Sequence, residues 1–267
     1  MRLLTRFPIM FIQSTFILYI ILNIFSCSEK NPTSNQNNLL DIRFPLNVGN
    51  KWIYHVTVEQ EDSVSITGMK INELEVTCEI TEQQRVYNTD SYRIDSVHRV
   101  ISGPDSGQVE TTQEWYAVKE DTLWAVANDG TSPWLTVLHK YSMFENTNEI
   151  SYWGVNVLVY PLEIGKEWEF SRVGDIGHKK VENFETINVP EGKIKAFKIV
   201  RELEWVPTSV SIDIVKGSYF IFNQWFSSIG LAKMTHESYD YSIRDEWGNG
   251  KKIFSETMEL VSYNIKE

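Results

Sequence analysis

Apolar residues recur at every second position in short runs through most of the chain, and this alternation constrains the fold more than any other feature. In residues 74–80, LEVTCEI, apolar and polar side chains alternate, which is the period of a strand with one buried face. Turn-forming stretches such as SGPDSG (102–107) and VPEG (189–192) separate these runs. No window longer than about ten residues carries a helical period. We therefore predict an all-β fold of antiparallel strands with few short helices, either a curved half-barrel or a sandwich.

Two runs depart from simple alternation. In FKIVRELEW (197–205) one face carries Phe197, Ile199, Leu203 and Trp205, and only Arg201 interrupts it. In SYFIFNQWF (218–226) both faces are apolar near residues 220–222, as expected of a central strand that is covered on both sides.

The chain writes nearly the same eleven residues twice, FPLNVGNKWIY at 44–54 and YPLEIGKEWEF at 160–170. A second pair, QEWY at 113–116 and NQWF at 223–226, follows in the same order. Two markers in one order indicate an internal duplication, with halves at about 41–150 and 155–267.

The repeated motif has the composition of a bend that leads into a strand. Pro45 and Pro161 hold the incoming segment extended, and Gly49 and Gly165 permit the positive φ of a tight turn. The aromatic residues that follow, such as Trp52, then point into a core. The alternative is that each motif forms one lobe of a ligand cleft.

The first 26 residues have the parts of a secretory signal. Arg2 and Arg6 precede a long apolar run, and the composition turns polar directly after Cys27. We interpret residues 1–26 as a signal peptide, 27–40 as a flexible polar tether and 41–267 as a β-rich domain. The alternative is an uncleaved membrane helix at the N-terminus.

The junction formed by Ile24, Ser26 and Cys27 resembles the lipobox of bacterial lipoproteins. The resemblance implies a diacylglycerol thioether on Cys27 and attachment of the protein to a membrane of the cell envelope. Ser28 stands where an aspartate would retain an enterobacterial lipoprotein at the inner membrane, which favours the outer membrane. The opening PLxVGxxWxY pattern and the late stretch WFSSIGLAK (225–233) also resemble uncharacterised envelope lipoproteins, which implies no particular activity.

Charge and cysteine content exclude several classes of function. Removal of residues 1–26 takes away two arginines and no acids, so the formal charge goes from −11 to −13. A chain this acidic lacks the basic surface of a nucleic-acid-binding protein. It would also be repelled by anionic lipids, which leaves the acyl chains to hold it. With Cys27 lipidated, Cys78 has no disulfide partner, and its place in an alternating run predicts an inert buried thiol.

No catalytic, cofactor or metal signature is present. The five histidines have no zinc-type spacing, and GPDSG (103–107) and GNGKK (248–252) fit turns better than a nucleophile loop or a phosphate loop. Trp134 and Trp247 stand beside turns, so they are the tryptophans that we expect on the surface.

These observations favour a lipid-anchored, non-catalytic binding or assembly module. Its partner would be an apolar ligand, a carbohydrate or an envelope protein. The alternative is a hydrolase of envelope polysaccharide or lipid, with carboxylates that the fold brings together. A third alternative is a purely structural role, which predicts an exposed apolar patch.

Overall fold

The computed structural model describes residues 42–61, 69–129, 151–172, 175–205, 218–244 and 250–266. The chain divides into two compact units, Met1–Leu40 and Asp41–Glu267, and the described residues all belong to the second. Cys27, Trp134 and Trp247 lie outside the described residues. The described ranges contain strands and turns but no α-helix, and hence no helix that is long and apolar enough to cross a membrane.

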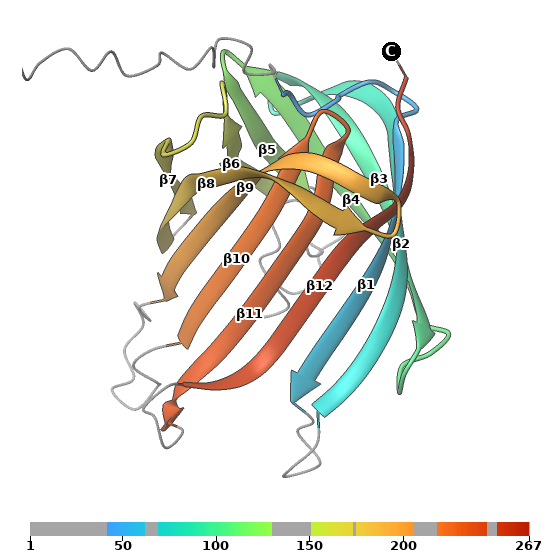
Figure 1. The fold of residues 1–267 in the computed structure, drawn as a ribbon. Coiled ribbons are helices and arrows are strands. Elements are labelled where there is room, and N and C mark those ends of the chain that lie inside the picture. The colour runs from blue at the N-terminus through green and yellow to red at the C-terminus, as the bar shows by residue number, and fades with distance from the viewer. Residues whose placement is uncertain are drawn as a thin grey trace, which may run out of the picture. The chain divides into compact units, whose positions relative to one another are not determined.

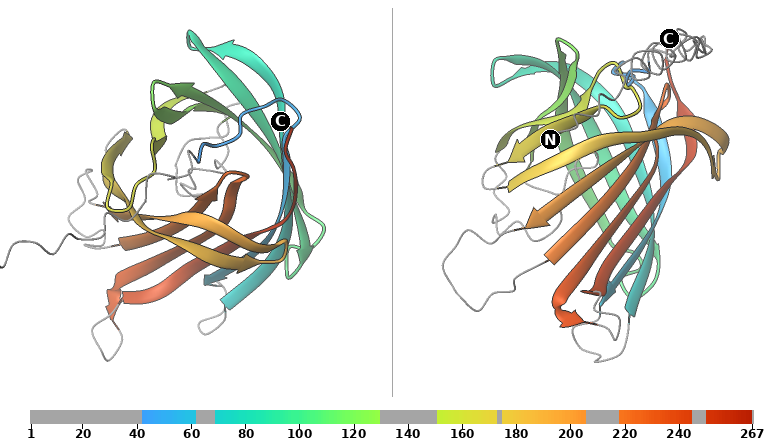
Figure 2. Two further views of the ribbon diagram at one scale, coloured as in Figure 1. Left: turned by 45° about the horizontal axis from the view of Figure 1, so that its top comes forward. Right: turned by 60° about the vertical axis from the view of Figure 1, so that its left-hand side comes forward.

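The described residues form twelve antiparallel strands in one sheet, which confirms the predicted all-β fold (Figure 1). The strands are β1 (Lys51–Glu61), β2 (Met69–Val86), β3 (Thr89–Ser102), β4 (Val109–Lys119), β5 (Thr122–Asn128), β6 (Ser151–Val159), β7 (Glu167–Arg172), β8 (Asp175–Val189), β9 (Gly192–Trp205), β10 (Ser218–Ser227), β11 (Gly230–Arg244) and β12 (Gly250–Asn264). Their order in the sheet is β6-β5-β4-β3-β2-β1-β12-β11-β10-β9-β8-β7. The sheet is single and strongly curved, so the curved alternative holds and the sandwich does not (Figure 2).

The two edge strands, β6 and β7, approach each other where the sheet curls round (Figure 2). Side chains from both ends of the sheet form hydrogen bonds across this junction. Asn156 Nδ2 on β6 donates to the Glu169 carbonyl on β7 at 2.9 Å. Lys179 Nζ on β8 donates to the Val157 carbonyl on β6 at 2.8 Å. We call this junction the seam.

The core lies on the inner face of the curve, and the alternation along each strand puts it there. Trp52 and Tyr54 on β1 are fully buried, and their Cα partners on β2 are Cys78 and Val76. Cys78 is a buried free cysteine whose sulfur accepts from Ser96 Oγ at 3.3 Å. The strand predicted for LEVTCEI is therefore confirmed, with its odd-numbered polar residues on the other face.

The aromatic residues of the first motif are structural. Trp52 Nε1 donates to the Ile229 carbonyl at 2.6 Å, and Tyr54 OH donates to the Leu231 carbonyl at 2.9 Å. These bonds reach over β12 to the β10–β11 hairpin, so each large ring fills the core while its polar atom is satisfied.

The two copies of the repeated motif make the same turn. Gly49 has φ 90° and Gly165 has φ 87°, as the sequence predicts. Gly49 N donates to the Ile80 carbonyl at 2.7 Å, and Gly165 N donates to the Val181 carbonyl at 2.8 Å. In each copy the strand that accepts this bond shifts register directly after the acceptor, at Ile80 in β2 and at Val181 in β8.

The second pair of markers also occupies equivalent places. QEWY lies in β4 and NQWF in β10, each the fourth of six consecutive strands. In each, the register shifts between the tryptophan and the next aromatic residue, at Trp115/Tyr116 and at Trp225/Phe226. These parallels support the duplication that the motifs predict.

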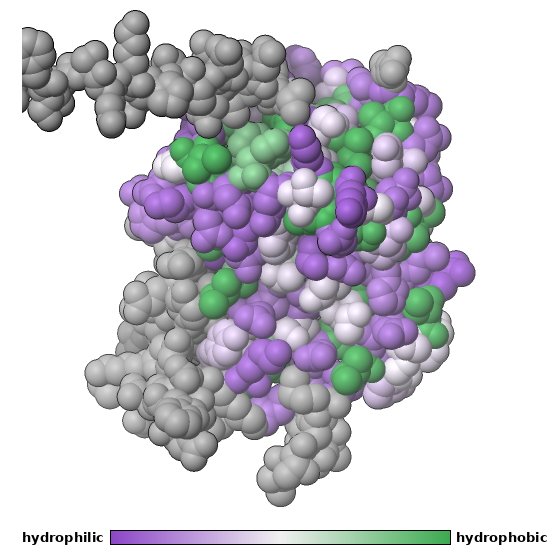
Figure 3. Space-filling model, viewed as in Figure 1, coloured by the Kyte–Doolittle hydropathy of each residue, from purple (hydrophilic) through white to green (hydrophobic). Residues whose placement is uncertain are grey.

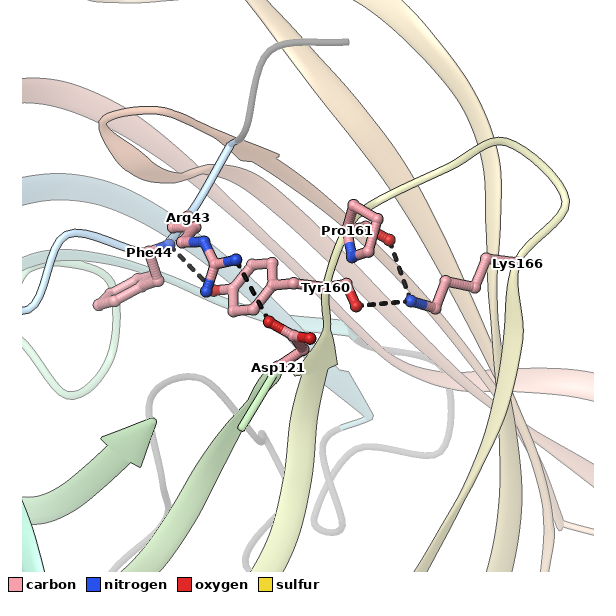
Figure 4. Close-up of polar contacts among 6 residues, drawn as sticks. All are labelled: Arg43, Phe44, Asp121, Tyr160, Pro161 and Lys166. Atoms are coloured by element: carbon pink, nitrogen blue, oxygen red, sulfur yellow. Dashed lines mark hydrogen bonds and ion pairs between the residues drawn. The ribbon is translucent and has the colours of Figure 1, made fainter. Parts of the chain in front are cut away.

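The two motifs meet in space (Figure 4). Tyr160 OH accepts a hydrogen bond from Phe44 N at 2.9 Å, and the Arg43 guanidinium lies 5.2 Å from the Tyr160 ring centroid while pairing with Asp121 at 3.3 Å. Lys166 Nζ donates to the Tyr160 carbonyl at 2.9 Å, which ties down the second turn. Residues that begin the first half are thereby held against the start of the second half, at one end of the core.

Candidate functional site

One row of inner-face side chains departs from the apolar composition of the core. Consecutive Cα partners across β8 to β12 are Lys179, Arg201, Phe222, His236 and Glu256. The first four are only 1–3% exposed. We call these five residues the inner row.

Arg201 is the residue that interrupts the apolar face of FKIVRELEW. The structure keeps it on that face and buries it. Its guanidinium carbon lies 4.0 Å from the ring centroid of Phe170 and 4.8 Å from that of Phe222. Two aromatic faces therefore stabilise this cation, an arrangement worth about 2 kcal/mol or more when desolvated.

Lys179 stands beside Arg201 as its cross-strand partner. Its Nζ lies 5.6 Å from the Phe170 ring centroid, so the two cations share one aromatic neighbour. Burial, and then the charge of Arg201, hold the pKa of Lys179 well below its ordinary value. The two side chains are directly opposed on neighbouring strands, so the ammonium and the guanidinium are close neighbours on the inner face.

The Lys179 ammonium has N–H donors that no described residue uses. An ammonium group has three N–H donors, and one donates to the Val157 carbonyl. Among the described residues Lys179 has no second acceptor and no carboxylate within salt-bridge distance. An incoming anion would meet unused donors here.

The middle of the row is a stacked pair. The rings of Phe222 and His236 lie 4.0 Å apart at an interplanar angle of 10°, and Phe254 packs on the other side of His236 at 5.0 Å. His236 Nε2 lies 3.1 Å from Ser238 Oγ. The three rings are buried next to the two cations, and the Phe254 ring is tilted by 50° to the His236 ring.

The acidic side chains of the inner face, among them Glu256 of the inner row, lie on strands other than the β8 and β9 strands that carry the two cations. Burial lowers the pKa of His98 on β3, while the charges of Glu110 on β4 and Glu256 on β12 oppose that shift. Further along β4, Glu114 is 2% exposed and accepts a short hydrogen bond from Tyr116 OH. The inner face is thus polarised, with cations on β8 and β9 and carboxylates on β4 and β12.

The outer face offers no comparable site on the same strands. Lys198 and Lys233 flank the Trp225 ring at 5.8 and 6.0 Å, and each lysine pairs with a glutamate on a neighbouring strand. On the face turned to the viewer in Figure 1, apolar residues are scattered among polar ones (Figure 3). Lys198 and Lys233, the two cations beside Trp225, are therefore already paired.

Within the described ranges, no three His, Cys, Asp or Glu side chains are grouped to hold a metal ion. Burial also raises the pKa of the Cys78 thiol, which accords with the inert role that the sequence predicts. The described tryptophans include Trp52 and Trp115, each at most 1% exposed. Trp52 packs in the main core, and Trp115 packs in a separate small buried cluster with residues such as Ala117 and Val126.

Sequence reasoning noted Arg201 but missed Lys179. HKKVENF, at 178–184, contains two adjacent lysines, and the register shift after Val181 obscures which of them points inward. If apolar and polar residues alternated along the whole of β8, the pattern would have identified Lys179 as an inward residue. The sequence of β8 does not alternate in this way.

No protein-family model and no curated protein matches the chain. Among solved structures, a "putative lipoprotein" from Parabacteroides distasonis ATCC 8503 is 12% identical, covers 83% of this chain and 97% of its own, and has a TM-score of 0.38. A "putative exported protein with YmcC-like fold" from Bacteroides fragilis NCTC 9343 is 11% identical, covers 84% and 99%, and has a TM-score of 0.43. Similarity at this level carries no argument about function, so the function has to be inferred from the residues themselves.

Proposed function

We propose that the chain is a lipid-anchored protein of the bacterial cell envelope that acts as a non-catalytic binding module. Its ligand would be received on the inner face of the sheet, at the inner row. The observation that carries the proposal is the pair of buried cations, Lys179 and Arg201, in an interior that is otherwise mostly apolar.

Burying charge is costly, and a fold does not need it. A fully buried Lys is rare unless it is paired, and a well-packed hydrophobic substitute for a buried charge is often at least as stable. Residues that break the rules of a core are most often retained for function. Aromatic rings around the cations, such as Phe170 and Phe222, supply a surface for the apolar part of a ligand.

The anchor rests on the residues at the signal junction, Ile24, Ser26 and Cys27. Two or three acyl chains on Cys27 would make a durable attachment, because each buried methylene contributes about 0.8 kcal/mol. The polar tether at 27–40 would then separate the lipid from the β-rich unit, which we place at the outer membrane.

Replacing Cys27 by Ser tests the anchor. Acyl labelling of the protein should be abolished, and the protein should no longer be held by covalent lipid. An unlabelled variant that behaves in membrane fractions as the parent does would mean that residues 1–26 are an uncleaved helix.

Native mass spectrometry of the unit Asp41–Glu267 tests the binding function, since this compact unit carries its own core. After purification from an exporting host, we expect an extra mass in stoichiometric amount that is lost on denaturation. A mass equal to that of the bare polypeptide, together with failure to bind any added amphiphile, would contradict the proposal.

A further inference from the structure

We infer that the sheet opens at the seam: β6 and β7 part from each other, while the other junction between the two halves of the sheet stays closed. The inference concerns a motion of the fold, so its test does not depend on the proposed binding function. It also gives that function an entrance, because the inner face becomes reachable when these two strands part.

The duplication gives the sheet two junctions between its halves. Strands β1–β6 form one half and β7–β12 the other, so β1 is equivalent to β7 and β12 to β6. The contact of β1 with β12, which we call the first junction, is a backbone ladder from Lys51↔Asn264 to Gln60↔Phe254. The seam is the equivalent junction, yet its strands are the two ends of the sheet, and no ladder joins them among the described residues.

The first junction is also fastened by side chains of the core. Trp52 and Tyr54 donate hydrogen bonds that pass over β12 to backbone carbonyls of the β10–β11 hairpin in the other half. The equivalent residues of the second motif are Trp168 and Phe170. Trp168 Nε1 is shielded from solvent and has no hydrogen-bond partner in the part of the chain that the structure describes, and Phe170 has no hydroxyl to donate. Both fastenings of the first junction are therefore missing at the seam.

Side chains hold the seam in place of a ladder. The Asn156 amide on β6 donates to the Glu169 carbonyl on β7, and the Lys179 ammonium reaches from β8 to the Val157 carbonyl on β6. The fit is incomplete, since the Asn156 amide oxygen is buried without a partner among the described residues. Parting β6 from β7 thus breaks fewer hydrogen bonds than parting β1 from β12.

The composition of β6 fits a strand that is covered for most of the time. Its sequence, SYWGVNVLV, contains no charged residue, whereas the shorter β7, EWEFSR, contains three. Strands that remain open at the edge of a sheet usually carry charges or prolines, which discourage pairing with another chain. The absence of charge from β6 is therefore consistent with a seam that is mostly closed and opens transiently.

One end of the seam is fixed by the chain itself. β6 ends at Val159, and the second motif turn leads directly into β7 at Glu167. Within this turn Lys166 Nζ donates to the carbonyls of Tyr160 and Pro161 at 2.9 and 3.0 Å (Figure 4). The two strands therefore stay together at the turn and part from their opposite ends, as the arms of a hairpin do.

Hydrogen exchange of the backbone amides, followed by mass spectrometry on the unit Asp41–Glu267, tests the opening without any ligand. The comparison is between the amides that bond β6 to β5 or β7 to β8 and the amides in the ladder between β1 and β12. We expect the first set to exchange at least about tenfold faster, because strands with fewer bonds at their junction open more often. Equal exchange at the two junctions would overturn the inference.

A disulfide distinguishes opening of the seam from fraying of the two strands. Asn156→Cys with Glu169→Cys places thiols at the bonded pair, and the unit's own cysteine, Cys78, is buried. Oxidation should slow exchange in β6 and β7 about tenfold. The matched control is Ile53→Cys with Ser262→Cys, since Ile53 is the motif equivalent of Glu169 and Ser262 is its Cα partner on β12. Equal slowing of β6 and β7 by both disulfides would overturn the inference.

A single substitution gives the same test without oxidation. Asn156→Ala removes a hydrogen bond across the seam, so exchange in β6 and β7 should become about fivefold faster while exchange at the first junction stays unchanged. An equal change at both junctions, or no change at either, would contradict an opening at the seam.

The two proposals can fail separately. Slow exchange at the seam together with a co-purified mass would overturn the opening and leave the binding function standing. Fast exchange confined to β6 and β7, with no co-purified mass and no binding of added amphiphile, would support the opening and contradict the binding function.

Discussion

Lys179 is the residue on which most of the account depends. It is buried beside another cation, and its only polar contact within the described ranges is the Val157 carbonyl. Burial and the charge of Arg201 together disfavour its protonated form, so the folded protein holds this proton less tightly than the unfolded chain does. This difference makes the stability of the fold depend on pH.

We predict that stability attributable to Lys179 rises with pH. Between its lowered folded pKa and its ordinary value of 10.5, the unfolded state binds more protons than the folded state, and unfolding therefore becomes less favourable as pH rises. Lys179→Met removes this slope and should be more stable than the parent by about 1–2 kcal/mol at the acidic end of the window.

Urea unfolding at several pH values, in the absence of ligand, gives the comparison. Only the difference between parent and variant is informative, because burial raises the pKa values of Tyr54 and Cys78, and these groups lower stability at alkaline pH in both proteins. A difference that does not change with pH would show that Lys179 is not a buried titrating group.

At the scale of the elements, alternation predicted strands and turns well. In residues 74–80 the even positions face the core, and in residues 197–201 the odd positions do, as expected. GPDSG forms the turn between β3 and β4. The order of the strands could not be predicted, because alternation says which face is buried and not which strand is the neighbour. A register shift also limits the prediction for β8. After Val181 the alternation between inward and outward side chains is interrupted, so the sequence pattern does not show that Lys179 points inward.

The two motif turns provide a prediction at this scale. Gly49→Ala and Gly165→Ala should each destabilise the fold by about 1–2 kcal/mol, because φ near +90° is strained for any residue with a Cβ. A new Cβ at Gly165 meets nothing within 4 Å, whereas at Gly49 it meets the end of the flexible Lys266 side chain. Denaturant unfolding should therefore give two similar losses, with the Gly49 variant the less stable. No loss at Gly165 would contradict the view that both motifs are structural turns.

At the scale of the whole molecule, we propose a lipid anchor joined to a curved sheet that buries two cations, Lys179 and Arg201. The signal junction, the tether and the duplication are predictions from the sequence alone, because each is written in consecutive residues. The inner row could not be predicted from the sequence, because its five residues lie on five different strands that become neighbours only in the folded sheet. The proposal that the chain binds a ligand depends on this alignment.

The most direct test of that proposal is a crystal structure of the unit Asp41–Glu267 as it is purified from an exporting host, without added ligand. We predict electron density for a bound molecule on the inner face, with a polar group within hydrogen-bond distance of Lys179 Nζ. An inner face that is filled entirely by the protein's own side chains would contradict the proposal.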